Sequence, residues 1–234
     1  MKVALFIPCY IDQLFPEVGV ATVKILRRFD VKIDYPLEQT CCGQPAFNTG
    51  YWLEAKTLAE KFLKIFSNYD YIVSPSGSCT SMVRIFYPEI LKNKNIEEIT
   101  AKFFELTEFL TKVLQVDSTG AEFNHSVAYH DSCHALRELG IKESPRTLLK
   151  NVKKIKLLEI EESDRCCGFG GTFAVKFPEI STEMAKSKVD NIIKTGAEFV
   201  TSTDSSCLMH IGGYMSKNGV KVKTIHIAQI LANF

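Results

Sequence analysis

The sequence predicts an α/β protein of two pseudo-symmetric halves, each a small parallel sheet flanked by helices. Short apolar runs alternate with helical patterns along the chain, and the order of these segments repeats once. All eight cysteines fall into two copies of one C–CCG–C pattern. Alternating strands and helices are typical of parallel sheets, which bind ligands beyond the carboxyl ends of their strands. We therefore expect the cysteine loops to lie near the interface of the halves.

The first half is expected to span residues 1–118. Apolar runs at 3–7, 31–35 and 71–73 are strand candidates, and cysteines follow each of them. A helical pattern runs from Glu54 to Phe66. Near the end of this half Phe103, Phe104 and Phe109 have helical spacing, which we interpret as a helix face buried in the core.

The second half, residues 119–234, repeats this order. Its strand candidates lie at 127–129, 155–159 and 199–200, and its helical pattern runs from Glu179 to Ile193 behind Pro178. The closing segment 225–231 is related to segment 104–110 of the first half. A turn at 117–120 favours a boundary within residues 116–124.

Composition restricts the classes of function. The chain has 234 residues, of which 46% are hydrophobic and 24% charged, as in ordinary globular proteins. A net charge of +1 gives no basic field, so we expect no nucleic-acid partner. We expect neither a transmembrane segment nor a signal peptide, and hence a cytoplasmic protein. In that reducing compartment cysteines favour metal or redox chemistry over structural disulfides.

The cysteine spacing predicts two metal sites. In the first copy 31 residues separate Cys9 from Cys41-Cys42-Gly43, and 36 separate Cys42 from Cys79. In the second copy the corresponding gaps are 32 and 39 residues, and its cysteines are Cys133, Cys166, Cys167 and Cys207. Four thiolates suit zinc or an iron–sulfur cluster. Adjacent cysteines bind two irons of a cluster more easily than one tetrahedral ion, so the pattern favours iron–sulfur.

Three other interpretations remain open. The thiols could be buried core residues, although a doubled pattern argues against that. The adjacent pairs could form strained, easily reduced disulfides, which leaves four distant cysteines unexplained. The chain could also be a non-catalytic zinc-binding scaffold of an oxidoreductase assembly. No flavin or nicotinamide fingerprint occurs.

The two motifs resemble the cysteine-rich CCG domain found in the cysteine-rich subunits of heterodisulfide reductase and of anaerobic glycerol-3-phosphate dehydrogenase. Longer strings resemble the lactate utilisation protein A family of bacterial iron–sulfur oxidoreductases, and they lie at 41–51, 74–79, 166–173 and 203–209. The resemblance implies an electron-transferring subunit in the oxidation of L-lactate, a small 2-hydroxy acid, to pyruvate. It also implies two partner proteins of the same lactate-utilisation system, one of them an iron–sulfur protein. Glycolate, glycerol-3-phosphate or a heterodisulfide are alternative substrates.

The chain departs from the fuller CCG pattern, which ends each copy with C-x2-C and there binds an unusual [4Fe–4S] cluster. Ser76 and Asp204 stand where the additional cysteine is expected. Four cysteines in each half suffice for a [4Fe–4S] cluster, so we expect one or two such clusters in the chain.

Several polar residues near the second set are candidates for chemistry. His130 and His134 flank Cys133 and could ligate iron, donate hydrogen bonds to the cluster or relay protons as catalytic groups. They could equally be buried histidines bonded to backbone. His210 could replace a missing thiolate or point to solvent. Arg165 and Lys176 could bind a substrate carboxylate, and the glycines at 168–171 could bring backbone amides to an anionic cluster. Because only the second set has such neighbours, we expect it to be closer to substrate.

Overall fold

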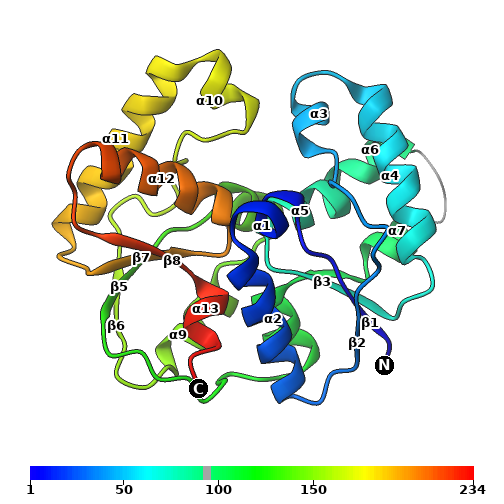
Figure 1. Cartoon of the computed structure of the whole chain (residues 1–234), viewed down its shortest axis with the longest axis horizontal. Helices are drawn as coiled ribbons and strands as arrows, with labels where there is room; N and C mark the ends of the chain where they lie inside the picture. The colour runs from blue at the N-terminus through cyan, green and yellow to red at the C-terminus, as the bar shows by residue number, and fades with distance from the viewer. Residues whose placement is uncertain (92–95) are drawn as a thin grey trace.

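A computed structural model describes residues 1–91 and 96–234 of the chain. These residues form two four-stranded sheets in which all neighbouring strands are parallel (Figure 1). The strand orders are β2-β1-β3-β4 and β6-β5-β7-β8, so the two sheets have the same topology. The predicted α/β fold with two pseudo-symmetric halves is confirmed.

The first half contains the strands β1 (Val3–Leu5), β2 (Ile33–Asp34), β3 (Tyr71–Ser74) and β4 (Phe103–Glu105). Its helices are α1 (Cys9–Leu14), α2 (Pro16–Arg28), α3 (Gln44–Asn48), α4 (Trp52–Phe66), α5 (Gly77–Ser81), α6 (Tyr87–Leu91), α7 (Ile96–Thr100) and α8 (Leu106–Glu108). Two π-helical turns, η1 (Met82–Phe86) and η2 (Phe109–Val113), continue α5 and α8.

The second half contains the strands β5 (Ser126–Tyr129), β6 (Lys156–Glu159), β7 (Phe199–Ser202) and β8 (Lys223–His226). Its helices are η3 (His134–Glu138, π-helical), α9 (Glu143–Lys150), α10 (Thr172–Lys176), α11 (Pro178–Lys194), α12 (Ser205–Lys217) and α13 (Ile227–Leu231). The predicted division after residue 118 stays a prediction.

The two sheets share one register. Val3 of β1 pairs with Ile33 and Tyr71, as Val127 of β5 pairs with Leu157 and Phe199. Cys9 follows Val3 by six residues, and Cys133 follows Val127 by the same number. Side chains at matching positions of the two halves can therefore be compared directly.

The halves share a hydrophobic core. Helices α2 and α13 lie between the two sheets (Figure 1), and their buried residues join β1 and β5 in one cluster. This cluster contains Leu5 and Tyr129 from the two central strands and Leu26 and Ile230 from the helices. Each half adds an outer core of its own, rich in phenylalanine in the first half. Because this shared core buries the inner faces of both sheets, the halves are held as one body.

Two local expectations differ from the structure. Phe103 and Phe104 belong to strand β4 and not to a helix, because Phe103 pairs with Ile72 of β3. Phe103 is fully buried, as predicted, whereas Phe104 is only partly buried. The strand expected at 31–35 is reduced to Ile33–Asp34, and Pro36, which has no N–H to donate, follows after one further residue.

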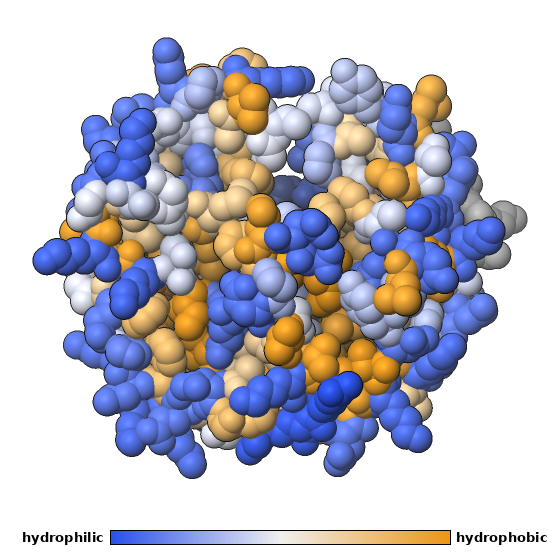
Figure 2. All heavy atoms as spheres, in the orientation of Figure 1, coloured by the Kyte–Doolittle hydropathy of each residue, from blue (hydrophilic) through white to orange (hydrophobic). Residues whose placement is uncertain are grey.

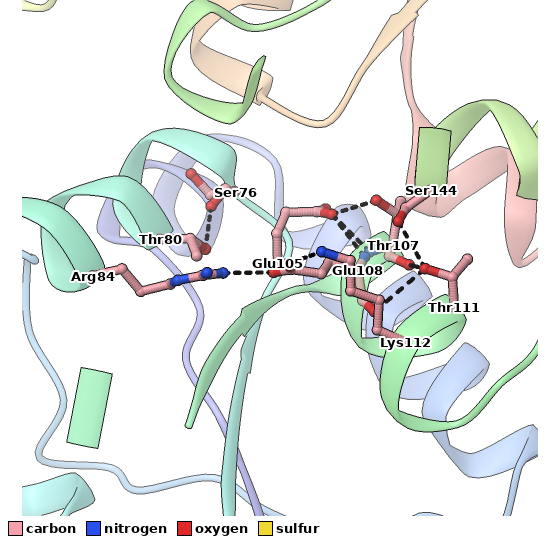
Figure 3. A network of polar contacts seen from close by, with 9 residues as sticks. All are labelled: Ser76, Thr80, Arg84, Glu105, Thr107, Glu108, Thr111, Lys112 and Ser144. Atoms are coloured by element: carbon pink, nitrogen blue, oxygen red, sulfur yellow. Dashed lines mark hydrogen bonds and ion pairs between the residues drawn. The ribbon is translucent and has the colours of Figure 1, made fainter. Parts of the chain in front are cut away.

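A polar network lies where β4 meets α8 (Figure 3). The buried Glu105 side chain accepts hydrogen bonds from the backbone N–H groups of Thr107 and Glu108 and so begins the helix. Glu108 forms ion pairs with Arg84 and Lys112. The Thr111 hydroxyl donates to Ser144 of α9 at 2.8 Å, which connects this network to the second half.

Candidate metal centres

All eight cysteines line one cavity of about 330 Å³. The surface is hollowed between the lobe that carries α3 and the lobe that carries α10 (Figures 1 and 2). Tyr10, Asn48, His134, Phe169, Asp204 and Met209 also line the cavity, so its wall draws on both halves. The expectation that the cysteine loops meet near the interface is confirmed.

The parallel topology explains why these cysteines meet. Cys9 and Cys133 follow the central strands β1 and β5, and Cys79 and Cys207 follow the neighbouring strands β3 and β7. Carboxyl ends of parallel strands lie at one edge of a sheet. Only the adjacent pairs are in irregular loops; Cys9, Cys79 and Cys207 lie in helices α1, α5 and α12.

The sulfur atoms of the first cysteine set lie close to one another. The Sγ atoms of Cys42 and Cys79 are 3.4 Å apart. Hydrogen bonds from Cys42 and Cys9 lower the pKa of Cys41 to about 3, whereas the bond between Cys9 and Cys41 raises the pKa of Cys9 above its ordinary value. Cys42 and Cys79 are buried and Cys9 is exposed, so the set runs from the core to the surface.

The second set repeats this arrangement. Hydrogen bonds from Cys133 and Cys167 lower the pKa of Cys166 to about 2. A hydrogen bond from Cys167 lowers the pKa of Cys207 to about 6. All eight cysteines carry free thiols. The contacts join members of one set, so the sulfurs gather four and four.

The glycine of each CCG motif has a defined role. The N–H groups of Gly43 and Gly168 donate to the sulfurs of Cys41 and Cys166, both at 3.4 Å. Gly168 has φ 91°, and a Cβ there would lie 2.7 Å from the Ser181 carbonyl oxygen. A side chain at this position is therefore excluded by both conformation and space.

His130 and His134 have different surroundings. His130 is fully buried, and neither ring nitrogen has a hydrogen-bond partner among the described residues. The potential ligand atoms of His130, Cys167 and Cys207 lie within 4.8 Å of one another. His134 lines the cavity with Nδ1 3.6 Å from the Cys133 sulfur and Nε2 3.9 Å from Glu138.

The other three candidates lie outside the cavity wall. His210 is 3.1 Å from the Ser181 hydroxyl, which itself donates to the Gly168 carbonyl, so His210 supports the CCG loop. Arg165 donates to Ser187 and Glu162 on the surface. Lys176 is exposed on α10. Of the residues that the structure describes, the cavity lining includes none of these three.

Sequence reasoning missed how the halves are tied together at the cavity. Asp204, fully buried, accepts hydrogen bonds from Tyr10 at 2.9 Å and from the Ser78 N–H at 2.6 Å, both in the first half. It also accepts from Ser132 and Ser206. Ser76 and Asp204 immediately precede α5 and α12, and their residue types, which are common N-caps, were the available signal.

A buried ion pair beside the second set was also missed. The Arg146 guanidinium on α9 donates to both oxygens of Asp131, at 2.8 and 2.7 Å, and to the partly exposed Glu159. Burial raises the pKa of Asp131, but hydrogen bonds from Arg146 and Ser163 outweigh it and hold the pKa below its ordinary value. The pair fixes the segment between His130 and Cys133.

The donor atoms present fit a thiophilic metal group. Each set presents four sulfurs at one place, and thiolates suit both iron–sulfur clusters and zinc. The second set adds two buried imidazole nitrogens without partners among the described residues. Unpaired buried polar atoms cost about 1–3 kcal/mol each, which a ligand bond to metal would offset.

Comparisons with known proteins agree with this architecture. A family model described as a cysteine-rich domain, CCG, matches residues 3–84 and 127–212. "Lactate utilization protein A" of Oceanobacillus iheyensis is 46% identical over 99% of this chain and 96% of its own length. The protein of the same name from Bacillus pumilus is 43% identical over 99% of both chains.

One solved structure supports the fold alone. A hypothetical protein from Helicobacter pylori superposes with a TM-score of 0.64 at 15% identity. The match covers 98% of this chain and 48% of that chain, so this chain corresponds to about half of the larger protein.

These findings define the chain as a protein of two cysteine-rich CCG domains whose cysteines gather at a shared cavity. Within that class, it belongs to the lactate utilization protein A family. Across residues 1–91 and 96–234, no helix has the length and apolar character needed to cross a membrane.

Proposed function

We propose that this chain is an iron–sulfur electron-transfer subunit in the oxidation of L-lactate to pyruvate. The observation that carries the proposal is the convergence of all eight cysteines on one cavity between the halves. Residues 1–118 hold one [4Fe–4S] cluster through Cys9, Cys41, Cys42 and Cys79. Residues 119–234 hold the other through Cys133, Cys166, Cys167 and Cys207.

The chain's own residues bind and shield the reacting groups. A bound cluster supplies one-electron transfer, which the side chains alone lack. Phe169 and Met209 make the cavity wall apolar and exclude water. Oxidation of lactate to pyruvate releases two electrons and two protons. The His134 imidazole in the cavity wall would accept one proton, the other would pass to water, and one electron would pass to each of the two clusters. Gly170 and Gly171 line the same cavity, and their backbone N–H groups are the proposed donors to the substrate carboxylate.

The proposal includes two partner proteins, one of them an iron–sulfur protein, in the cytoplasm. It is supported by the name that the relatives carry and by the sequence, which has no flavin or nicotinamide fingerprint. The electrons therefore leave the chain for another protein.

The test begins with protein purified without oxygen. We expect a brown protein with broad visible absorption and equal amounts of iron and acid-labile sulfide. Cys42→Ser and Cys167→Ser should each lower the iron content by the share of one cluster. A colourless, iron-free protein prepared in this way contradicts the proposal.

The role of His134 is tested in the complex reconstituted with both partners. His134→Ala should reduce lactate oxidation at least tenfold while iron content stays unchanged, because it removes a proton acceptor and no proposed cluster ligand. His210→Ala, which lies outside the cavity wall, is the matched control. Unchanged turnover in His134→Ala contradicts this role. Glycolate, glycerol-3-phosphate and a heterodisulfide, offered in place of lactate, determine the substrate.

A zinc-binding scaffold is the second candidate. It is favoured by the grouping of His130, Cys167 and Cys207 within 4.8 Å, since one nitrogen and two sulfurs are common zinc ligands. Stoichiometric zinc in the colourless protein purified without oxygen would establish it.

A further inference from the structure

The two cysteine sets differ at one buried position beside them. His130 follows β5 in the second half, and its backbone N–H donates to Thr201 of the adjacent strand segment at 2.9 Å. This bond fixes the residue on the sheet. Its imidazole is fully buried and lies within 4.8 Å of ligand atoms of Cys167 and Cys207. Neither ring nitrogen has a hydrogen-bond partner among the described residues.

The matching position in the first half is Phe6. The shared register aligns Val3 with Val127, so Phe6 stands where His130 stands. Phe6 packs edge-on against Phe62 and Phe66, with ring centroids 5.3 and 5.7 Å apart. The first half thus fills this place with apolar core, whereas the second half places two unpaired nitrogens there.

The nearby Asp204 carboxylate does not compete with His130 as a metal ligand. Asp204 lies beside the same cysteines, but its two oxygens already accept hydrogen bonds from Tyr10, Ser78 and Ser206. His130 is therefore the residue that adds a metal-ligand atom to the four sulfurs of the second set. It approaches Cys167 and Cys207, the two buried cysteines of that set, from within the protein.

We propose that His130 is an additional, nitrogen ligand to iron in the second centre, beside Cys133, Cys166, Cys167 and Cys207, while the first centre is ligated by cysteine alone. This inference rests on the proposed function, because it takes the bound group to be an iron–sulfur cluster. In this proposal His130 is a metal ligand, whereas His134 lines the cavity and keeps its role as proton acceptor.

The mixed donor set makes the two centres different as electron carriers. A neutral imidazole adds a ligand without adding negative charge, whereas a thiolate at the same place would add one. The reduction potential of the second centre should therefore respond to the charge of the side chain at position 130.

The decisive experiment uses full-length protein labelled with ¹⁵N-histidine and purified without oxygen. Pulsed electron paramagnetic resonance of the reduced protein should show strong coupling of one histidine nitrogen to a cluster. The coupling should vanish in His130→Phe, which copies the first half, and persist in His134→Phe. Loss of one cluster's iron in His130→Phe, with the other cluster retained, also supports ligation.

A redox titration provides an independent readout. His130→Cys replaces the imidazole by a thiolate, so it should retain iron and shift the potential of the second centre downward. Strong coupling that persists in His130→Phe, or its absence from iron-loaded wild-type protein, overturns this inference alone. Absence of iron from the wild-type protein overturns the proposed function as well, so the two failures are distinguishable.

Discussion

Removal of the Arg146 side-chain charge tests the ion pair beside the second cysteine set. Arg146→Met retains much of the side-chain length but leaves Asp131, whose side chain is 1% exposed, without its cation. Two charges about 4 Å apart interact by about 4 kcal/mol at the effective dielectric of protein sites. Glu159 is 55% exposed, so the loss of its contact adds under about 1 kcal/mol. We expect Arg146→Met to lower the free energy of unfolding by about 3–5 kcal/mol, as for other broken buried pairs.

Urea unfolding followed by circular dichroism measures this change. Glu159→Gln is the matched control and should cost under about 1 kcal/mol. Asp131→Asn combined with Arg146→Met should cost much less than the sum of the single variants, because the uncompensated charge is gone.

The pH dependence has a definite sign. Since the pKa of Asp131 is held below its ordinary 3.8, the contribution of the pair is complete above pH 3.8 and is lost as pH falls below it. The difference in the free energy of unfolding between wild type and Arg146→Met should therefore become smaller at acid pH. A loss under about 1 kcal/mol at neutral pH, or one that is constant down to pH 3, refutes this reasoning.

Two further predictions concern stability. Burial raises the pKa of Glu105 to about 8, so the folded protein holds a proton that the unfolded chain releases near pH 4.5. Stability should fall as pH rises from about 4.5 to about 8, by up to about 1.4 kcal/mol per pH unit, and the slope in urea titrations should flatten in Glu105→Gln. Gly168→Ala should cost about 1–3 kcal/mol, because its Cβ would lie 2.7 Å from the Ser181 oxygen at φ 91°. Gly213→Ala, whose Cβ meets no described atom within 4 Å, is the control and should be neutral or stabilising in thermal unfolding. Equal costs for the two glycine variants, or a pH slope unchanged in Glu105→Gln, would contradict these assignments.

Much of the fold could be predicted because the chain is duplicated. Apolar runs before each cysteine predicted β1, β3, β5 and β7, and the helical periods predicted α4 and α11 within a few residues of their bounds. The fourth strand of each sheet was missed. In β4 the residues Phe103 and Phe104 are adjacent aromatics, and such a short apolar run does not distinguish a strand from a helix.

Only those features of the site that follow from local sequence patterns could be predicted. Repeated spacing predicts two ligand sets of four cysteines each, and this assignment stays a prediction. The hydrogen bonds from Tyr10 to Asp204 and from Arg146 to Asp131 join segments that the sequence does not relate, 194 and 15 residues apart. Such contacts depend on how the two halves pack and on which face of α9 is buried. No spacing rule contains that information.

The duplication also explains how one backbone supports two different sites. Because β1 and β5 share a register, the chain can change side chains around a cysteine set without moving its sulfurs. In the first half the residues between strand and cysteine are Phe6, Ile7 and Pro8, all buried and apolar. In the second half they are His130, Asp131 and Ser132, all buried, so this segment needs Arg146 to compensate its charge. Buried polar groups are costly, and in the segment between the central strand and the first cysteine only the second half carries buried histidine and aspartate. That asymmetry is the physical reason to expect different chemistry from two sets of cysteines with the same spacing.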